Sequence, residues 1–168
     1  MIVHTFSGYE LRPAGLDDLE LARAWTNADP DHIGRVDPAF WIHQAPGMES
    51  WLLCDGKGPV FFFKAIIHRE TLEVHIQFPP YPIQENAGKQ IEHRRRVSLA
   101  LIEGTRWLEQ RVKGLEKMRF ESQNPSLIRF AEKYLGFTNF GGQLTKSLKE
   151  APYVRLNRRA ESDPARTN

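Results

Sequence analysis

The sequence predicts an α/β (α+β) domain in which a mixed, mostly antiparallel sheet carries helices on both faces. The first observation is a set of three strand-like runs, Trp51 to Cys54, Val60 to Ile67 and Leu72 to Phe78. The second is the turns that join them, at 55–58 and 69–70, which indicate an antiparallel meander because glycine supplies the backbone angles of hairpin turns. The third is the alternation of helix and strand that follows, which calls for a mixed sheet.

The segment before the meander predicts one strand and two helices. Tyr9 to Pro13 alternates apolar and polar residues and indicates a first strand. Asp17, followed three residues later by Glu20, predicts a helix that begins with a capping box. Asp37-Pro38 indicates a short second helix in a long connection. Trp41 lies in that connection, and the sequence leaves open whether it lines a pocket or fills the core.

The segment after the meander predicts two helices and three strands. Prolines and a glycine make 79–90 a loop, and apolar residues at helical spacing predict a long helix from Ile91 to Val112. A strand follows around Met118, and a capped helix runs from Asn124 to Gly136. Two last strands are expected within 137–140 and 143–156. We therefore predict one domain over 1–157 and a disordered tail over 158–168.

Composition narrows the class of protein. The chain has 168 residues and a net charge of +2, so its overall field does not favour nucleic acid as a partner. Its one cysteine, Cys54, follows two leucines and is predicted to be a buried thiol. The histidines lack zinc spacing, so no metal is expected. Without a secretion signal or an apolar run of membrane-spanning length, a cytoplasmic protein that needs no membrane is predicted. A homodimer is left open.

The order of elements resembles the GNAT superfamily of acyl-CoA N-acyltransferases. At the start of its long helix that family carries an Arg/Gln-x-x-Gly-x-Gly/Ala turn, and the stretch from Arg95 to Ala100 is similar, with Ser98 in place of the first glycine. The resemblance implies that backbone N–H groups there hold the pyrophosphate of coenzyme A, as helix N-termini hold anions in general. The cofactor-binding residues that it implies are Gln77, Phe78, Arg94, Arg95, Arg96, Val97, Ser98 and Asn124.

A second motif supports the same resemblance. The segment from Asn124 to Phe137 is similar to the GNAT segment that begins with Asn and ends in Tyr-Glu-Lys-Leu-Gly-Phe. The family implies pantetheine contacts for Asn124 and, for Tyr134, the role of the acid that protonates the departing thiolate. The spacing is one residue longer than in the family, and it displaces Tyr134 toward the end of the helix.

Candidate base residues lie on the third meander strand. Glu73, His75 and Gln77 share one face because side chains alternate along a strand. Acyl transfer to an amine needs a group that removes a proton, so Glu73 or His75 is predicted to be the base. The alternative is a solvated face without a catalytic role. In the family, a backbone N–H of this strand polarises the thioester carbonyl.

The resemblance thus implies an N-acyltransferase that moves an acetyl or other acyl group from acyl-CoA, such as acetyl-CoA, to an amine acceptor. A catalytically inactive GNAT-like binding module is the alternative. The arginine run from Arg94 to Arg96 leaves a nucleic-acid-binding protein as a third, less favoured hypothesis. The acceptor and the length of the acyl chain stay open.

Overall fold

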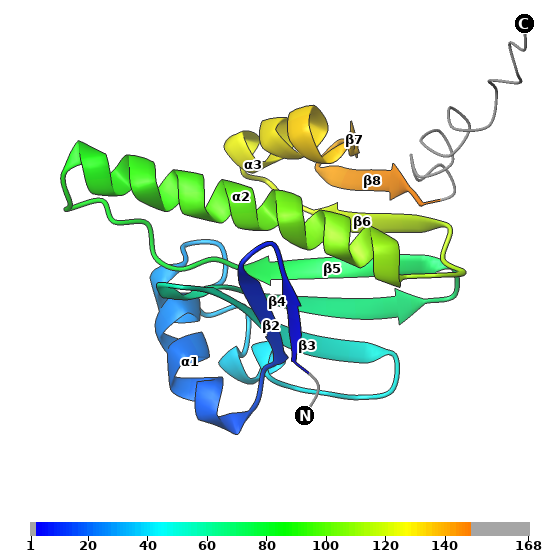
Figure 1. The fold of residues 1–168 in the computed structure, drawn as a ribbon, viewed down its shortest axis with the longest axis horizontal. Coiled ribbons are helices and arrows are strands. Elements are labelled where there is room, and N and C mark those ends of the chain that lie inside the picture. The colour runs from blue at the N-terminus through cyan, green and yellow to red at the C-terminus, as the bar shows by residue number, and fades with distance from the viewer. Residues whose placement is uncertain (1–2, 149–168) are drawn as a thin grey trace, which may run out of the picture.

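The computed structural model describes residues 3–148 and shows one eight-stranded sheet of order β1-β2-β3-β4-β5-β6-β8-β7 (Figure 1). The boundary expected at residue 157, the end of the last expected strand and the tail over 158–168 lie outside the described residues. The strands are β1 (His4–Phe6), β2 (Tyr9–Pro13), β3 (Met48–Asp55), β4 (Gly58–His68), β5 (Thr71–Gln77), β6 (Lys117–Glu121), β7 (Thr138–Phe140) and β8 (Gln143–Ser147).

Helices cover both faces of the sheet. One face packs against α2 (Ala87–Arg111), α3 (Pro125–Phe130) and the π-helical turn Ala131–Leu135, with Leu101 and Leu135 in the shared core. The other face packs against α1 (Leu19–Ala28) and the 3-10 turn Pro38–Trp41, where Trp25 and Trp41 lie against Phe62. The predicted mixed, mostly antiparallel sheet is confirmed.

The sheet is antiparallel except between β5 and β6. Strands β3, β4 and β5 form the predicted meander, with Arg69 in a left-handed conformation at its second turn. The parallel pairing of β5 with β6 covers three positions and ends at Glu73 opposite Arg119. Both strands continue beyond this point, so the sheet opens there and leaves main-chain groups of 74–77 without a neighbour on β6.

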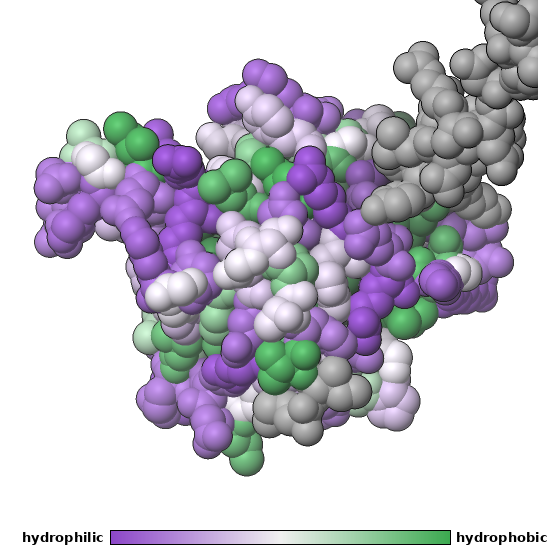
Figure 2. Space-filling view, viewed as in Figure 1, coloured by the Kyte–Doolittle hydropathy of each residue, from purple (hydrophilic) through white to green (hydrophobic). Residues whose placement is uncertain are grey.

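The start of the long helix was predicted wrongly. It begins at Ala87 rather than Ile91, because the side chain of Asn86 accepts a hydrogen bond from the N–H of Lys89 and caps the first turn. A helix of 25 residues is about 37 Å long, whereas the seven residues of β5 span about 23 Å. The first turns of α2 therefore project beyond the sheet, and their surface is mostly hydrophilic (Figures 1 and 2).

Two smaller expectations also need correction. The residue at the N-cap position of the first helix is Asp18 and not Asp17, and its side chain makes no hydrogen bond to the helix. The carboxylate of Asp18 accepts instead from the N–H of Gly15 and from the Nη1 of Arg12. A 3-10 turn over Leu16–Asp18 shifts the cap by one residue. Cys54 is half-buried rather than fully buried, although burial still raises the pKa of its thiol above the ordinary value.

Arg96 joins α2 to the β3–β4 hairpin. Its Nε lies 2.6 Å from Oδ2 of Asp55, and its Nη2 donates to Oδ1 of Asp55 and to the carbonyl of Gly58. Hydrogen bonding to Arg96 lowers the pKa of Asp55 and outweighs the opposing effect of burial. The Nε and Nη2 of Arg96 are therefore already engaged within the fold.

Replacing Arg96 by alanine is expected to lower the free energy of unfolding by about 1–3 kcal/mol, since a bidentate charge-assisted contact is lost. Because the folded pKa of Asp55 is lowered, this stabilisation is complete above the ordinary Asp pKa of about 3.9. The stabilisation disappears as the pH falls through the lowered pKa of Asp55 in the folded protein. Denaturant titrations between pH 7 and pH 2 check this. Arg106→Ala, which removes an exposed arginine on the same helix, should change stability little, and equal losses in both variants would contradict the assignment.

Candidate functional site

A groove opens where β5 and β6 diverge. It consists of two adjoining cavities of about 420 and 610 Å³ that share six lining residues. One wall is the connection after α1, the floor is β5 and the loop after it, and the opposite wall is β6 with the start of α3. The shared residues are His32, Arg35, Ile76, Phe78, Glu121 and Leu127.

His75 lines the groove and is hydrogen-bonded to a fixed carboxylate. Its Nε2 lies 2.7 Å from Oε1 of Glu73, and the other carboxylate oxygen of Glu73 accepts from the Nε of Arg119 at 3.0 Å. The ring of Phe40 lies edge-on to the imidazole, with 5.4 Å between ring centroids. The imidazole of His75 thus lies between the carboxylate of Glu73 and the groove.

The charge state of Glu73 defines the tautomer of His75. Burial alone would raise the pKa of Glu73, but hydrogen bonds from Arg119 and His75 outweigh it and lower that pKa below its usual value. An ionised carboxylate only accepts hydrogen bonds, so Nε2 of His75 carries the proton. In the neutral ring, Nδ1 then keeps a lone pair. The lowered pKa keeps Glu73 ionised, so this carboxylate acts as a hydrogen-bond acceptor for His75 and Arg119.

Gln77 is fully buried and does not face the groove. Its amide oxygen lies 2.7 Å from Nδ1 of His32, and its Nε2 donates to Oδ2 of Asp29 at 3.0 Å. These bonds hold the segment after α1 against the end of β5. Gln77 therefore positions one wall of the groove, whereas its neighbour Phe78 lines the groove itself.

Lys64 supports the same wall from beneath. It is fully buried, and its ammonium group donates to the carbonyls of Phe40 and His43 and to the hydroxyl of Ser50. The ammonium also lies 4.5 Å from the centroid of the Phe40 ring, which lies beside His75. Burial lowers the pKa of Lys64. Sequence reasoning missed this residue because it read Lys64 only as an interruption of an apolar run.

The expected phosphate-binding turn is a helix. Residues Arg94 to Ser98 lie in the interior of α2, where backbone N–H groups donate to carbonyls four residues earlier and are not free for a ligand. Arg94 lies over the ring of Tyr81, with 5.2 Å to its centroid, while Arg95 is exposed. Val97 and Ser98 are half-buried, and Val97 packs against the core.

Asn124 and Tyr134 lie at opposite ends of one short helical segment. The Oδ1 of Asn124 accepts from the N–H of Ser126 at 2.9 Å, and Asn124 borders the groove. The extra residue of this segment is absorbed by the π-helical turn Ala131–Leu135, which Gly136 closes at a φ of 74°. Tyr134 is 55% exposed, packs on Phe130 and is not among the residues that line the groove.

Sequence reasoning also missed residues on the groove walls. His32, Arg35 and Glu121 line both of its cavities, and none of the three belongs to a motif. Trp41, for which the sequence left both positions open, lines the smaller cavity and also fills the core beside α1. Within residues 3–148, no group of three or more histidine, cysteine or acidic side chains is arranged to hold a metal ion. Among the described helices, none is both long and apolar enough to cross a bilayer.

Comparison with solved structures identifies the fold. A GNAT-family acetyltransferase from Bacillus anthracis matches with a TM-score of 0.62 at 14% identity, over 89% of this chain and 100% of that one. A GNAT-family acetyltransferase from Streptococcus pneumoniae gives a TM-score of 0.54 at 13% identity, over 83% and 98%. The ribosomal-protein-S18-alanine N-acetyltransferase of Escherichia coli gives 0.53 at 17% identity, over 85% and 96%.

Structural neighbours across most of the chain are thus GNAT-family acetyltransferases, and the protein has a GNAT-like α+β fold. No protein-family model matches the sequence, and no curated protein matches it. At these levels of identity the likeness establishes the fold alone.

Proposed function

We propose that this protein is an N-acyltransferase that transfers an acetyl or other acyl group from acyl-CoA to an amine. The observation that carries this proposal is the opening of the sheet after Glu73 and Arg119, where main chain of β5 that has no partner on its β6 side borders a groove lined by His75. An extended thioester arm can pair with such main-chain groups. One N–H there can polarise the thioester carbonyl as negative charge develops on its oxygen.

The proposed reaction needs no covalent enzyme intermediate. The amine nitrogen attacks the thioester carbonyl carbon, the C–S bond breaks and an amide bond forms. The amine loses one proton to His75, whose Nδ1 lone pair is available. The thiolate of coenzyme A leaves and takes a proton from water, since Tyr134 lies outside the groove. Glu73 orients His75 and stabilises the imidazolium that forms.

The phosphates of coenzyme A are proposed to bind arginine side chains rather than a backbone turn. Arg95 is the first choice because it is exposed on α2, whereas Asp55 holds Arg96. Arg95→Ala is expected to weaken acetyl-CoA binding by about 10- to 100-fold, the value of one charge-assisted phosphate contact. Calorimetric titration measures this, with Arg106→Ala as the matched control on the same helix. Equal affinity in wild type and Arg95→Ala would remove Arg95 from the site.

An inactive acyl-CoA-binding module is the second candidate. The helical conformation of 95–98 and the exposure of Tyr134 favour it, because both depart from the pattern of the family. Thiol release separates the two candidates. Binding of acetyl-CoA with release of free thiol in the presence of a mixed panel of amines supports the enzyme, whereas binding without release for any amine supports the module.

Tyr134→Phe is expected to leave the turnover rate unchanged at every pH, since the hydroxyl of Tyr134 does not reach the groove. The measurement is thiol release between pH 6 and pH 10, with Tyr81→Phe as a comparison because Tyr81 lines the groove. A loss of tenfold or more in Tyr134→Phe alone, at about the level of general-acid catalysis, would restore the role that the sequence resemblance implied.

A further inference from the structure

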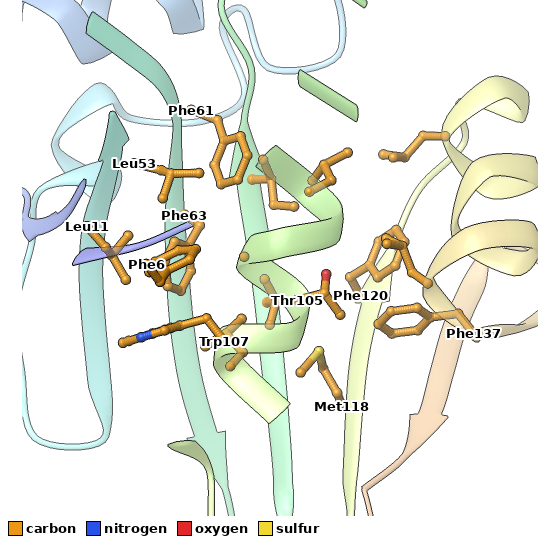
Figure 3. A pocket seen from close by; sticks show the side chains of 17 residues that line it. Phe6, Leu11, Leu53, Phe61, Phe63, Thr105, Trp107, Met118, Phe120 and Phe137 are labelled. Carbon is orange, nitrogen blue, oxygen red and sulfur yellow. The ribbon is translucent and has the colours of Figure 1, made fainter. Parts of the chain in front are cut away.

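An apolar cavity lies between α2 and the sheet. Its 17 lining residues are almost all apolar, and Thr105 contributes the one side-chain hydroxyl among them. Figure 3 shows the rings of Phe61 and Phe63 on one side of it and those of Phe120 and Phe137 on the other. By volume it measures about 40 Å³, more than the 10–15 Å³ or so that one water molecule needs on the same measure.

The cavity arises from a missing side chain. Gly104 lies on the face of α2 that packs on the sheet, and a Cβ atom built there would come no closer than 3.7 Å to the ring of Phe61. Glycine inside a helix is destabilising, and an apolar void loses packing contacts. Alanine would fit at this position, so packing does not demand the glycine. The fold keeps open a space that a methyl group would begin to fill.

This cavity adjoins the groove at the point where β5 and β6 separate. Val74, Ile76, Phe120 and Leu127 line both the cavity and the groove. A thioester that lies along the open edge of β5 has these four residues beside its acyl carbon. Water gains little in such a space, since an apolar cavity offers it almost no hydrogen bonds.

We propose that the cavity is an acyl pocket and that the acyl donor carries an aliphatic chain longer than acetyl. This inference rests on the proposed function and specifies its donor. Each further methylene that leaves water for the cavity is expected to strengthen binding about fourfold. Butanoyl-CoA, with two more methylenes than acetyl-CoA, should therefore bind about 15-fold more tightly. The affinity for coenzyme A, which carries no acyl group, measures the contribution of the rest of the site.

The test compares three ligands and three proteins by calorimetry. The ligands are coenzyme A, acetyl-CoA and butanoyl-CoA, and the proteins are wild type, Gly104→Leu and Gly104→Ala. Gly104→Leu fills the cavity, so the preference for butanoyl-CoA should fall to about one while the affinity for coenzyme A is unchanged. Gly104→Ala is the control: it should keep most of the preference and raise the thermal midpoint by about 2–4 °C. Thr105→Leu fills the cavity from a neighbouring position if Gly104→Leu fails to fold.

The outcomes distinguish a failure of this inference from a failure of the proposed function. If coenzyme A and both esters bind wild type with equal affinity, or if the preference for butanoyl-CoA survives in Gly104→Leu and Thr105→Leu, the acyl pocket is refuted and the proposed function stands. If none of the three ligands binds wild type, the proposed function fails, and the inference fails with it.

Discussion

Replacing His75 by asparagine is expected to lower kcat for acyl transfer by about 10²- to 10⁴-fold, the usual contribution of a positioned general base. The affinity for acetyl-CoA should stay the same, since no proposed coenzyme contact is removed. The reason is the order of groups at the groove: Glu73 accepts from Nε2, and the other ring nitrogen keeps its lone pair. Thiol release at saturating ester and amine measures kcat, and calorimetry measures the affinity.

Two further variants make this result specific. His68→Asn changes an exposed histidine at the end of β4 and should leave kcat unchanged. Glu73→Gln should lower kcat less than His75→Asn does, because it removes the charge that orients the base and leaves the base in place. If Glu73→Gln abolishes turnover while His75→Asn retains it, the assignment is reversed and Glu73 is the base.

Replacing Lys64 by methionine is expected to lower the free energy of unfolding by about 2–4 kcal/mol. The ammonium group donates to three acceptors in a fully buried site, and methionine leaves the carbonyls of Phe40 and His43 without this donor. Because Phe40 borders both Lys64 and His75, the Michaelis constant for the amine should rise as well. Urea titration measures the first effect and initial rates measure the second.

The matched control is Lys57→Met, which replaces an exposed lysine in the hairpin turn and should change stability by less than about 0.5 kcal/mol. The pH dependence gives a second readout. Since burial lowers the pKa of Lys64, the unfolded chain binds this proton more tightly. The free energy of unfolding of the wild type, relative to that of Lys64→Met, should then rise with pH between the lowered pKa of Lys64 in the folded protein and the ordinary lysine pKa of about 10.4. Equal stability of both proteins would contradict a structural role for Lys64.

The sheet and its helices were predictable because local signals and tertiary packing agree. The turns at 55–58 and 69–70 specify the meander, and Asn124 and Gly136 mark the ends of one helical segment in the structure as in the sequence. The start of α2 was not predicted, since Asn86 and Gly88 are as typical of a loop as of a capped first turn. The assignment of Arg95 to Ser98 to a turn came instead from the family resemblance, since the predicted helix from Ile91 already included these residues.

The sequence predicted the site only where the alternation of side chains along a strand decides which residues share a face. The shared face of Glu73 and His75 follows from strand geometry, and their hydrogen bond is an outcome of that geometry. Arg119 is 46 residues away in sequence, and its contact with Glu73 depends on the parallel pairing of β5 and β6. The buried position of Lys64 and the cavity beside Gly104 depend on packing between distant elements, for which a single sequence carries no pattern.

The most direct test of whether the groove binds an acyl-CoA is to locate acetyl-CoA on the protein by amide NMR. In wild type, saturating acetyl-CoA is expected to shift the backbone amide signals of 74–78, at the end of β5 and just after it, and of 120–127, from the end of β6 to the start of α3. The same titration with His75→Asn should give the same map, because the base does not hold the ester. Shifts confined to other surfaces, or no shifts at millimolar acetyl-CoA, would contradict the claim that this groove binds an acyl-CoA.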